Sequence, residues 1–307
     1  MVIPTRRRET RLAFALEALA EQRLDASRFE VIVVRDGDAA EPLAQAPPGL
    51  AVRFLTRPGV AGPTAKRNVG WRATAAPLIA FTDDDCRAQP GWLESLLAAA
   101  GGGVLLQGRT EPDPDERALL HGFARSQEII GLSGWYETCN MAYPRELLER
   151  LGGFDESFPF GGEDTDLAYR AIESGATPVY VDDAVVWHAV MHRSLGRALR
   201  EAGAWSQMSG VVARHPDLRD ALYLGVFWRK SHAALLLALA GAAVGRRRPA
   251  VALGAALPYL ELRLNWRSPS ARRLARRLAT LPAWAAIDAV EVASRLPAAV
   301  RNRTLVI

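Results

Sequence analysis

Short apolar runs rich in β-branched residues alternate with helical patterns along the first third of the chain. Four segments are expected to be strands: residues 2–4, 29–34, 52–56 and 78–82, with 29–34 and 78–82 as buried strands. Three helical patterns separate or follow them: residues 11–22, 62–75 and 90–100. Strands that alternate with helices predict an α/β fold, with a mostly parallel sheet flanked by helices. A nucleotide site is expected at the carboxyl ends of such strands.

The middle of the chain changes character after a loop rich in Pro, Asp and Glu at residues 111–116. Two helices are expected at residues 144–151 and 164–174, because a glycine follows each pattern. Further expected elements follow in order: strands at 177–181 and 185–188, and one long amphipathic helix at 193–214. We therefore expect a first domain over residues 1–215.

Residues 216–307 differ from this pattern and predict a helical tail. Two apolar stretches, residues 233–244 and 249–260, are separated by Gly245 and three arginines. Each would be a helix of roughly 18 Å, whereas the hydrocarbon core of a bilayer is about 30 Å thick. A helical hairpin that dips into one leaflet fits these lengths. The arginines of residues 271–284 alternate with leucines, which favours a helix lying on anionic lipid.

The charge distribution supports this division of the chain. From Ala221 onward the sequence has 14 Lys and Arg against 3 Asp and Glu, a local charge of +11. The chain as a whole carries +4, so residues 1–220 carry −7. An acidic first part suits cation or phosphate chemistry, and a basic, apolar tail suits an anionic surface. We expect no nucleic-acid partner.

Composition excludes several classes of protein. With 49% hydrophobic and 23% charged residues the chain is neither disordered nor collagen-like. The two cysteines, Cys86 and Cys139, have no CxxC spacing, which argues against a disulfide scaffold or a thiolate zinc site. No secretory signal pattern opens the sequence, and we expect the catalytic part to be cytoplasmic.

Three consecutive carboxylates, Asp83, Asp84 and Asp85, end the apolar run at residues 78–82. Like charges this close are costly without a counter-ion, and divalent cations bind clustered oxygen ligands. The structural alternative is a cap for the helix that follows, but one acid would suffice for that. The cluster therefore favours a metal or phosphate role.

A second acidic group lies at a glycine-rich helix start, where Glu163 and Asp164 follow Gly161 and Gly162. A carboxylate here is a plausible general base, with acidic helix capping as the alternative. His188 ends an apolar strand, where a lone histidine is more often structural than a ligand.

Two cationic segments are candidates for phosphate binding. Arg6, Arg7 and Arg8 follow the first strand, although a surface charge run is the ordinary explanation. The turn at residues 59–63, together with Lys66 and Arg67, can also cradle phosphate.

The order of these segments resembles glycosyltransferase family 2, the inverting enzymes with a GT-A fold that use nucleotide-diphospho-sugars. The resemblance covers about residues 1–215. Residues 2–5 are similar to the family's opening strand and residues 31–37 to its V-V-D-D-G strand, with Arg35 in place of the first acid. Three more segments resemble family motifs: residues 62–70 the G-x-x-x-A-x-R-N-x-G segment, 82–93 the DxD strand end, and 140–164 the acceptor-side block.

This resemblance implies a nucleotide-sugar site at the strand ends. By the family pattern Asp36 contacts the base, usually uracil, while Asp83 lies on the ribose side. The whole donor-binding set that we expect is Pro4, Thr5, Arg6, Asp36, Lys66, Arg67, Asp83 and Asp84.

The resemblance also implies the catalytic residues. Asp164, beside Glu163, would be the base that deprotonates an acceptor hydroxyl in a direct, inverting displacement. Asp85 would hold a divalent metal, Mn²⁺ or Mg²⁺. His188 falls where many members carry a metal-ligating histidine, so we expect it to be the second ligand.

Two further expectations concern the residues that border the acceptor and the location of the tail. Trp135, Tyr136 and Glu137 are candidates to border the acceptor, since aromatic faces suit sugar rings, and a buried aromatic pair is an equal alternative. The tail resembles that of membrane-associated bacterial members acting on cell-surface glycans or lipid-linked acceptors. It implies a catalytic domain at the cytoplasmic face of the cell membrane.

Two other functions are alternatives to a transferase. A sugar-nucleotide nucleotidyltransferase would need a glycine-rich loop after the first strand, and residues 4–8 contain no glycine. A non-enzymatic membrane-bound scaffold would not need the acids Asp83, Asp85 and Asp164 together with His188. Both alternatives are therefore less favoured.

Overall fold

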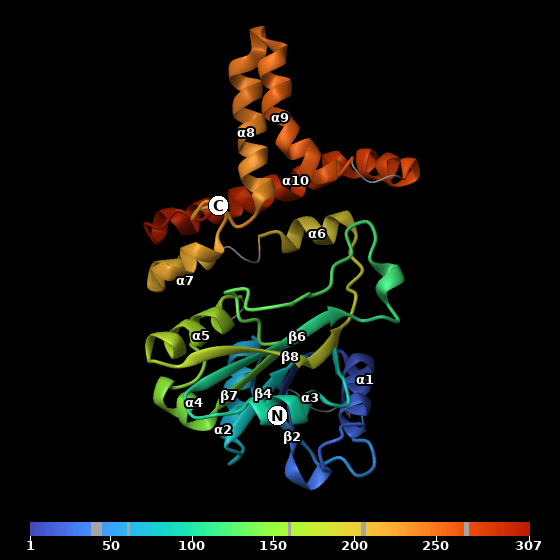
Figure 1. The fold of residues 1–307 in the computed structure, drawn as a ribbon, viewed down its shortest axis with the longest axis vertical. Coiled ribbons are helices and arrows are strands. Elements are labelled where there is room, and N and C mark those ends of the chain that lie inside the picture. The colour runs from blue at the N-terminus through green and yellow to red at the C-terminus, as the bar shows by residue number, and fades with distance from the viewer. Residues whose placement is uncertain (38–44, 60–61, 159–160, 204–206, 267–269) are drawn as a thin grey trace. The chain divides into compact units, whose positions relative to one another are not determined.

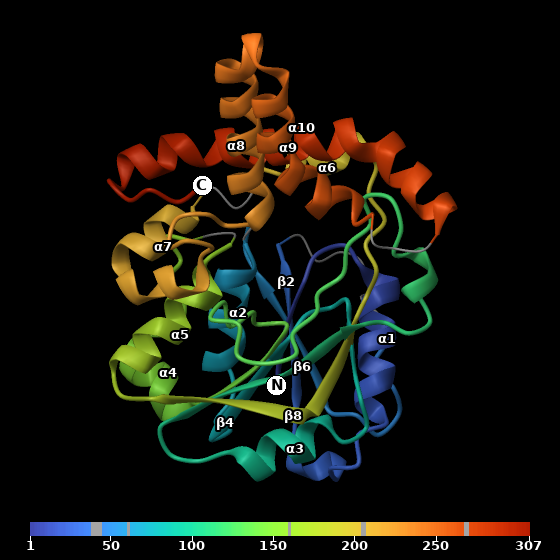
Figure 2. The ribbon, with the colours of Figure 1, turned by 45° about the horizontal axis from the view of Figure 1, so that its top comes forward.

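The computed structural model describes residues 1–37, 45–59, 62–158, 161–203, 207–266 and 270–307. These residues form two compact units, Met1–His192 and Arg193–Ile307. The turn expected at residues 59–63 lies partly outside the described residues, at 60–61. Figures 1 and 2 show the ribbon in two orientations.

The first unit is built on one sheet, to which the described residues contribute eight strands in the order β3-β2-β1-β4-β7-β6-β8-β5. Its first four strands run parallel: β1 (Val2–Thr5), β2 (Val31–Asp36), β3 (Val52–Arg57) and β4 (Leu78–Thr82). The apolar runs at the start of the sequence are thus confirmed as parallel strands.

The remaining strands make the sheet mixed: β5 (Cys86–Ala88), β6 (Val104–Pro112), β7 (Asn140–Pro144) and β8 (Thr177–His188). β7 runs antiparallel to both β4 and β6, whereas β8 runs parallel to β6 and antiparallel to β5. The two short strands expected at 177–181 and 185–188 are one strand, whose pairing with β6 shifts in register after Gly108.

Helices cover both faces of the sheet: α1 (Glu9–Ala20), α2 (Pro63–Arg72), α3 (Trp92–Ala99), α4 (Arg145–Leu151) and α5 (Glu163–Glu173). Neighbouring residues of a strand point to opposite faces, and Val2 and Ile3 accordingly belong to different core clusters. Ile3 packs in a cluster with Leu16 of α1 and Trp92 of α3. Val2 packs with residues of α2, α4 and α5. The strand ends between these layers are where the expected site residues meet.

The second unit is helical: α6 (Leu195–Glu201), α7 (Met208–Arg214), α8 (Lys230–Val244), α9 (Pro249–Leu264) and α10 (Ala271–Arg301). The single helix expected at 193–214 is wrong, because two short helices occupy that range, with residues 204–206 outside the described part. Both contact α10, and the second compact unit accordingly begins at Arg193. Short 3₁₀ turns complete the described elements: Ala26–Arg28, Arg117–Leu119, Pro216–Ala221 and Gly245–Arg247.

The hairpin expected from the two apolar stretches is present as α8 and α9, which lie side by side in Figure 1. A Cβ at Gly241 would lie 2.2 Å from that of Ala255, so glycine is what allows the two helices to approach this closely. Large apolar side chains face outward, with Leu253 66% and Val244 80% exposed. Among the described helices, none combines the length and apolar character needed to cross a membrane.

Candidate active site

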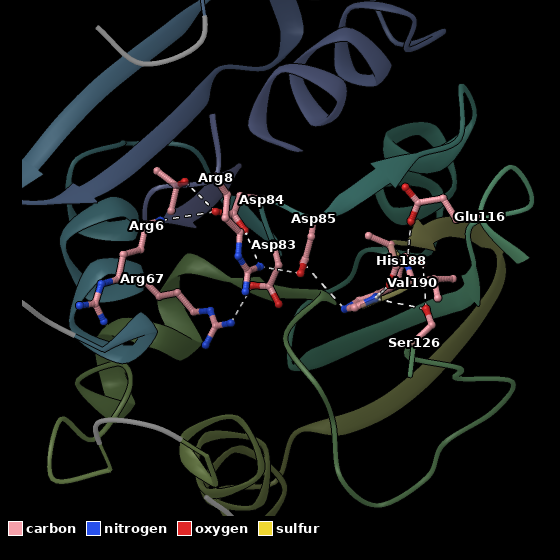
Figure 3. Close-up of polar contacts among 12 residues, drawn as sticks. Arg6, Arg8, Arg67, Asp83, Asp84, Asp85, Glu116, Ser126, His188 and Val190 are labelled. Atoms are coloured by element: carbon pink, nitrogen blue, oxygen red, sulfur yellow. Dashed lines mark hydrogen bonds and ion pairs between the residues drawn. The ribbon is translucent and has the colours of Figure 1, made fainter. Parts of the chain in front are cut away.

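Asp83, Asp84 and Asp85 occupy the connection between β4 and β5. The three-residue strand β5 pairs antiparallel with the end of β8, and Cys86 stands opposite His188. The backbone N–H of Ala189 donates to the carbonyl of Asp85 at 2.9 Å, which fixes this pairing next to the acids. Two segments about a hundred residues apart in sequence are thereby brought to one place, as Figure 3 shows.

His188 faces Asp85 across a short gap, with 3.8 Å between Nε2 and Oδ1. Its other nitrogen, Nδ1, lies 2.8 Å from the carbonyl oxygen of Ala189, and a carbonyl can only accept, so Nδ1 carries the proton. The lone pair of Nε2 therefore points to the side of the carboxylate. Backbone contacts of this kind orient metal-binding histidines.

These residues fit a divalent cation. A span of 3.8 Å accommodates two metal–ligand bonds of about 2.1 Å each. Cys86 also lies within 4.8 Å of both donors, but contact with Cys139 and burial raise the pKa of its thiol well above the usual value. A protonated thiol is a poor ligand. The residues that could hold a cation here are thus Asp85 and His188, and an imidazole donor suits Mn²⁺ better than Mg²⁺.

Asp84 ties the end of β1 to this connection. Its carboxylate accepts hydrogen bonds from the Thr5 hydroxyl at 2.7 Å and from Arg8 Nη1 at 3.0 Å. Burial, together with the neighbouring charge of Asp85, raises the pKa of Asp84 to about 6. Asp84 and Thr5, both expected to touch the donor, are engaged with each other.

The cationic side chains of the expected donor site lie at the ends of β1 and β2. Lys66 Nζ donates to the carbonyl of Thr5 at 3.0 Å and lies 3.4 Å from Asp36 Oδ1. Arg6 Nε lies 3.4 Å from the other oxygen of Asp36. Burial of Lys66 lowers the pKa of its ammonium group. Two cations and a carboxylate thus share one strand edge, beside Pro4 in the buried end of β1.

Arg67 is almost completely buried and links the two acidic groups of the site. Its Nη2 donates to Asp83 Oδ1 at 2.8 Å, and its Nη1 donates to Glu163 Oε1 at 3.0 Å. Arg67, expected in the donor-binding set, has two of its nitrogen atoms hydrogen-bonded to carboxylates. It holds the start of α5 next to the end of β4.

Asp164 follows Glu163 in the first turn of α5, after Gly162 in the left-handed region at φ 96°. Burial raises the pKa of Asp164 well above its usual value, and the charge of Glu163 raises it further. Asp166 is engaged elsewhere, because it pairs with Arg170 within the same helix. Of the acids at this helix start, Asp164 is the one with the properties of a general base.

The sequence model described as Glycosyl transferase family 2 matches residues 1–151. These residues belong to glycosyltransferase family 2. The match covers four parallel strands, the three acids and the strand β7.

Two relatives are bacterial glycosyltransferases. The chain is 28% identical over 270 residues to a validoxylamine A glucosyltransferase of Streptomyces hygroscopicus subsp. limoneus, with 74% of this chain and 58% of the relative covered. It is 30% identical over 207 residues to the pre-mycofactocin glycosyltransferase of Mycobacterium tuberculosis, with 62% and 43% covered. The chain thus spans less than two thirds of the length of either relative.

Solved structures show the same GT-A-like fold. A mannosyltransferase from Pyrobaculum calidifontis, in complex with GDP-Man and Mn²⁺, superposes with a TM-score of 0.57 at 21% identity, covering 97% of this chain and 85% of that one. TarS of S. aureus in complex with UDP-GlcNAc gives a TM-score of 0.52 at 13% identity, covering 99% and 91%.

The expected acceptor residues lie next to α5. Thr165 donates its hydroxyl hydrogen to the carbonyl of Trp135 at 2.7 Å. Tyr136 is buried, packs edge-on against Tyr169 and adopts φ 53°, a strained value for a non-glycine residue. Glu137 is held by polar side chains, and burial raises its pKa. Trp135 and its neighbours therefore border the helix start that carries Asp164.

One residue of the site, Ser126, was not expected, and a second, Arg8, was expected only as part of a cationic run. Ser126 donates to the carbonyl of His188 at 2.8 Å and supports the histidine from a loop 62 residues away. Nothing local in the sequence points to that contact. Arg8 was visible only as part of a cationic run, and its position directly after β1 was the available signal.

Proposed function

We propose that this chain transfers a sugar from a nucleotide-diphospho-sugar, with UDP as the favoured carrier, to a hydroxyl group of a glycan or lipid-linked acceptor. The observation that carries the proposal is the bridge made by Arg67 between Asp83 and Glu163. Because of it, the Asp85–His188 pair and the expected base Asp164 border one site.

The proposed reaction is a single displacement with inversion at the anomeric carbon. A bond forms between the acceptor oxygen and the anomeric carbon while the bond from that carbon to the diphosphate oxygen breaks. Asp164 takes the hydroxyl proton, for which its raised pKa makes it a stronger base than an ordinary aspartate. Arg6 and Lys66 supply positive charge where the diphosphate would lie.

The proposed cofactor is a divalent ion, with Mn²⁺ favoured over Mg²⁺, held by Asp85 and His188. Such an ion would neutralise charge on the leaving diphosphate, an effect worth several kcal/mol. The support is the fit of the donor pair and the orientation of His188 by Ala189.

A calorimetric panel tests the donor. The full chain is titrated with UDP, GDP, CDP and dTDP, each with Mn²⁺ and each with EDTA. We expect one diphosphate to bind in a metal-dependent way, and Asp85→Ala to lose that dependence. Asp164→Asn is the matched control, because it should bind the nucleotide as before yet transfer no sugar. Absence of binding by every nucleotide to folded protein would contradict the proposal.

We further propose that the helical tail binds an anionic membrane surface at the cytoplasmic face of the cell membrane. The support is the outward-facing apolar side chains of the α8–α9 hairpin, the exposed arginines at residues 246–248 and the charge of +11 over residues 221–307.

Vesicle flotation tests this membrane proposal. We expect recovery with phosphatidylglycerol vesicles at low salt and much less with phosphatidylcholine. The double variant Leu237→Asp, Leu253→Asp should lose binding, because it charges the outer face of the hairpin. Leu119→Asp, at an equally exposed leucine of the first unit, is the control. Equal flotation with both lipids, or none with either, would contradict the proposal.

A further inference from the structure

Arg8 contacts the same carboxylate that faces His188. Its Nη1 lies 2.5 Å from Asp85 Oδ2 and 3.0 Å from Asp84 Oδ1, as Figure 3 shows. The two oxygens of Asp85 are therefore divided, with Oδ2 on the guanidinium and Oδ1 toward the imidazole at 3.8 Å. A cation bound between Asp85 and His188 would share its carboxylate with a permanent positive charge.

Arg67 pairs with Asp83 and Glu163, and Arg8 pairs with Asp84 and Asp85, so each arginine offsets one of two carboxylate charges. With a divalent ion beside Arg8, three positive charges would face the two negative charges of Asp84 and Asp85, which leaves an excess of positive charge. A diphosphate group removes this excess, because it carries two or more negative charges.

Arg8 is also placed to respond to such a ligand. Its side chain is 41% exposed, whereas those of Asp84 and Asp85 are 6% and 7% exposed. The guanidinium thus lies on the solvent side of the buried acids, and its planar fork suits phosphate oxygens as well as carboxylates.

We propose that Arg8 couples the two ligands of the site: it weakens binding of the metal ion alone and strengthens binding of the metal together with a nucleoside diphosphate. This inference rests on the proposed function. It makes Arg8 a positioning and coupling residue, which acts through Asp85 and through the diphosphate.

A thermodynamic cycle on the full chain tests the coupling. Binding of Mn²⁺ alone is measured from the paramagnetic resonance signal of free Mn²⁺, and binding of the diphosphate selected by the panel is measured calorimetrically with EDTA and with Mn²⁺. The factor by which each ligand tightens the other must be the same in both directions.

We expect Arg8→Gln to bind Mn²⁺ alone about tenfold more tightly, because a repulsive charge near the ion is removed. The same substitution should reduce the coupling factor about tenfold. Arg8→Lys, which keeps the charge, should retain most of the coupling. Arg28→Gln makes the same change in net charge in the 3₁₀ turn that precedes β2, and should match the unsubstituted chain.

The outcomes separate the inference from the proposed function. If the unsubstituted chain binds both ligands but Arg8→Gln leaves the affinity for Mn²⁺ and the coupling unchanged, Arg8 only positions Asp85 and the inference is wrong. If Arg8→Gln binds Mn²⁺ more weakly, it is also wrong. If the unsubstituted, folded chain binds no diphosphate with Mn²⁺, the proposed function fails, and the inference falls with it.

Discussion

Two clusters of histidine and carboxylate side chains, one in each compact unit, have similar compositions. They differ in whether the histidine nitrogen and the carboxylate oxygens are already hydrogen-bonded to other side chains. In the first unit His188 Nε2 and Asp85 Oδ1 are 3.8 Å apart, too far for a hydrogen bond. In the second unit His232 Nε2 lies 2.9 Å from Glu291 Oε2. Asp288, beside them, accepts hydrogen bonds from three further side chains: Ser231, Tyr259 and Arg263.

This difference separates a ligand site from a structural network. A metal ion needs lone pairs that no donor has taken, and Asp288 has none to offer while Arg263 binds both of its oxygens. Arg229 lies 3.4 Å from Glu291, and Arg295 lies nearby in the same helix as both acids. These cations disfavour a metal. The cluster instead joins α8, α9 and α10 at the base of the hairpin.

The largest expected effect concerns the first cluster. Asp85→Ala should lower the rate of sugar transfer about 10³-fold, because several kcal/mol of charge stabilisation are lost. Its melting temperature should stay close to that of the unsubstituted chain. Steady-state kinetics and calorimetric melting check the two parts. His232→Ala should show the reverse, with reduced stability and little change in the rate per folded molecule.

Removal of Asp288 from the second cluster should be costly for stability. Asp288→Ala leaves the Arg263 guanidinium without its carboxylate, and the free energy of unfolding of the second unit should fall by about 3 kcal/mol. Urea unfolding followed by circular dichroism measures it. Asp220→Ala, at an exposed acid of the same unit, should be nearly neutral. A similar loss in both variants would mean that the network does not hold the helices together.

The number of Mn²⁺ ions bound per chain distinguishes the two histidine–carboxylate clusters. We expect one Mn²⁺ per chain, and a stabilisation of about 2.7 kcal/mol when free Mn²⁺ exceeds its Kd a hundredfold. Equilibrium dialysis should give no ion for Asp85→Ala and one ion for His232→Gln. Two ions per chain, with one lost in His232→Gln, would break the distinction between the clusters.

A smaller effect concerns pH. Asp164 must be ionised to accept a proton, so activity should fall as pH decreases through its raised pKa. Glu163→Gln removes a charge that raises this pKa, and the acidic limb of the kcat/KM profile should move to lower pH. The pH profile of Glu163→Asp, which keeps the charge, serves as the control. A limb that moves to higher pH would exclude this role for Glu163.

The strands with a clear local pattern of apolar residues were predictable from the sequence, and those without one were not. β1 to β4 are apolar runs flanked by helices, and periodicity alone places them. β8 was divided because the acids Asp182 and Asp183 interrupt its apolar residues, whereas its pairing with β6 continues past them. β5 has only three residues, which is too short for any periodic signal. Tertiary pairing, which the local sequence does not encode, decides such cases.

In the site, likewise, the positions of residues along the strands were predictable, but their contact partners were not. The topology of an α/β fold predicted that Asp36 and Asp83 would lie at strand ends, and they do. The partners of each side chain were not predictable. The motif around Arg67 predicts a phosphate ligand. In the structure Arg67 donates a hydrogen bond to Glu163, which is 96 residues away in sequence. Charge balance in a buried site depends on such distant neighbours.

The pairing of β5 with β8 has a consequence for how the gene can vary. Cys86 stands opposite His188, and successive side chains of a strand alternate between the two faces of the sheet. A one-codon insertion or deletion that shifted this short ladder by one residue would turn the imidazole to the other face while every site residue remained in the sequence. Divergent copies should therefore tolerate changes of length in the loop at residues 45–50 far more readily than within these two strand ends.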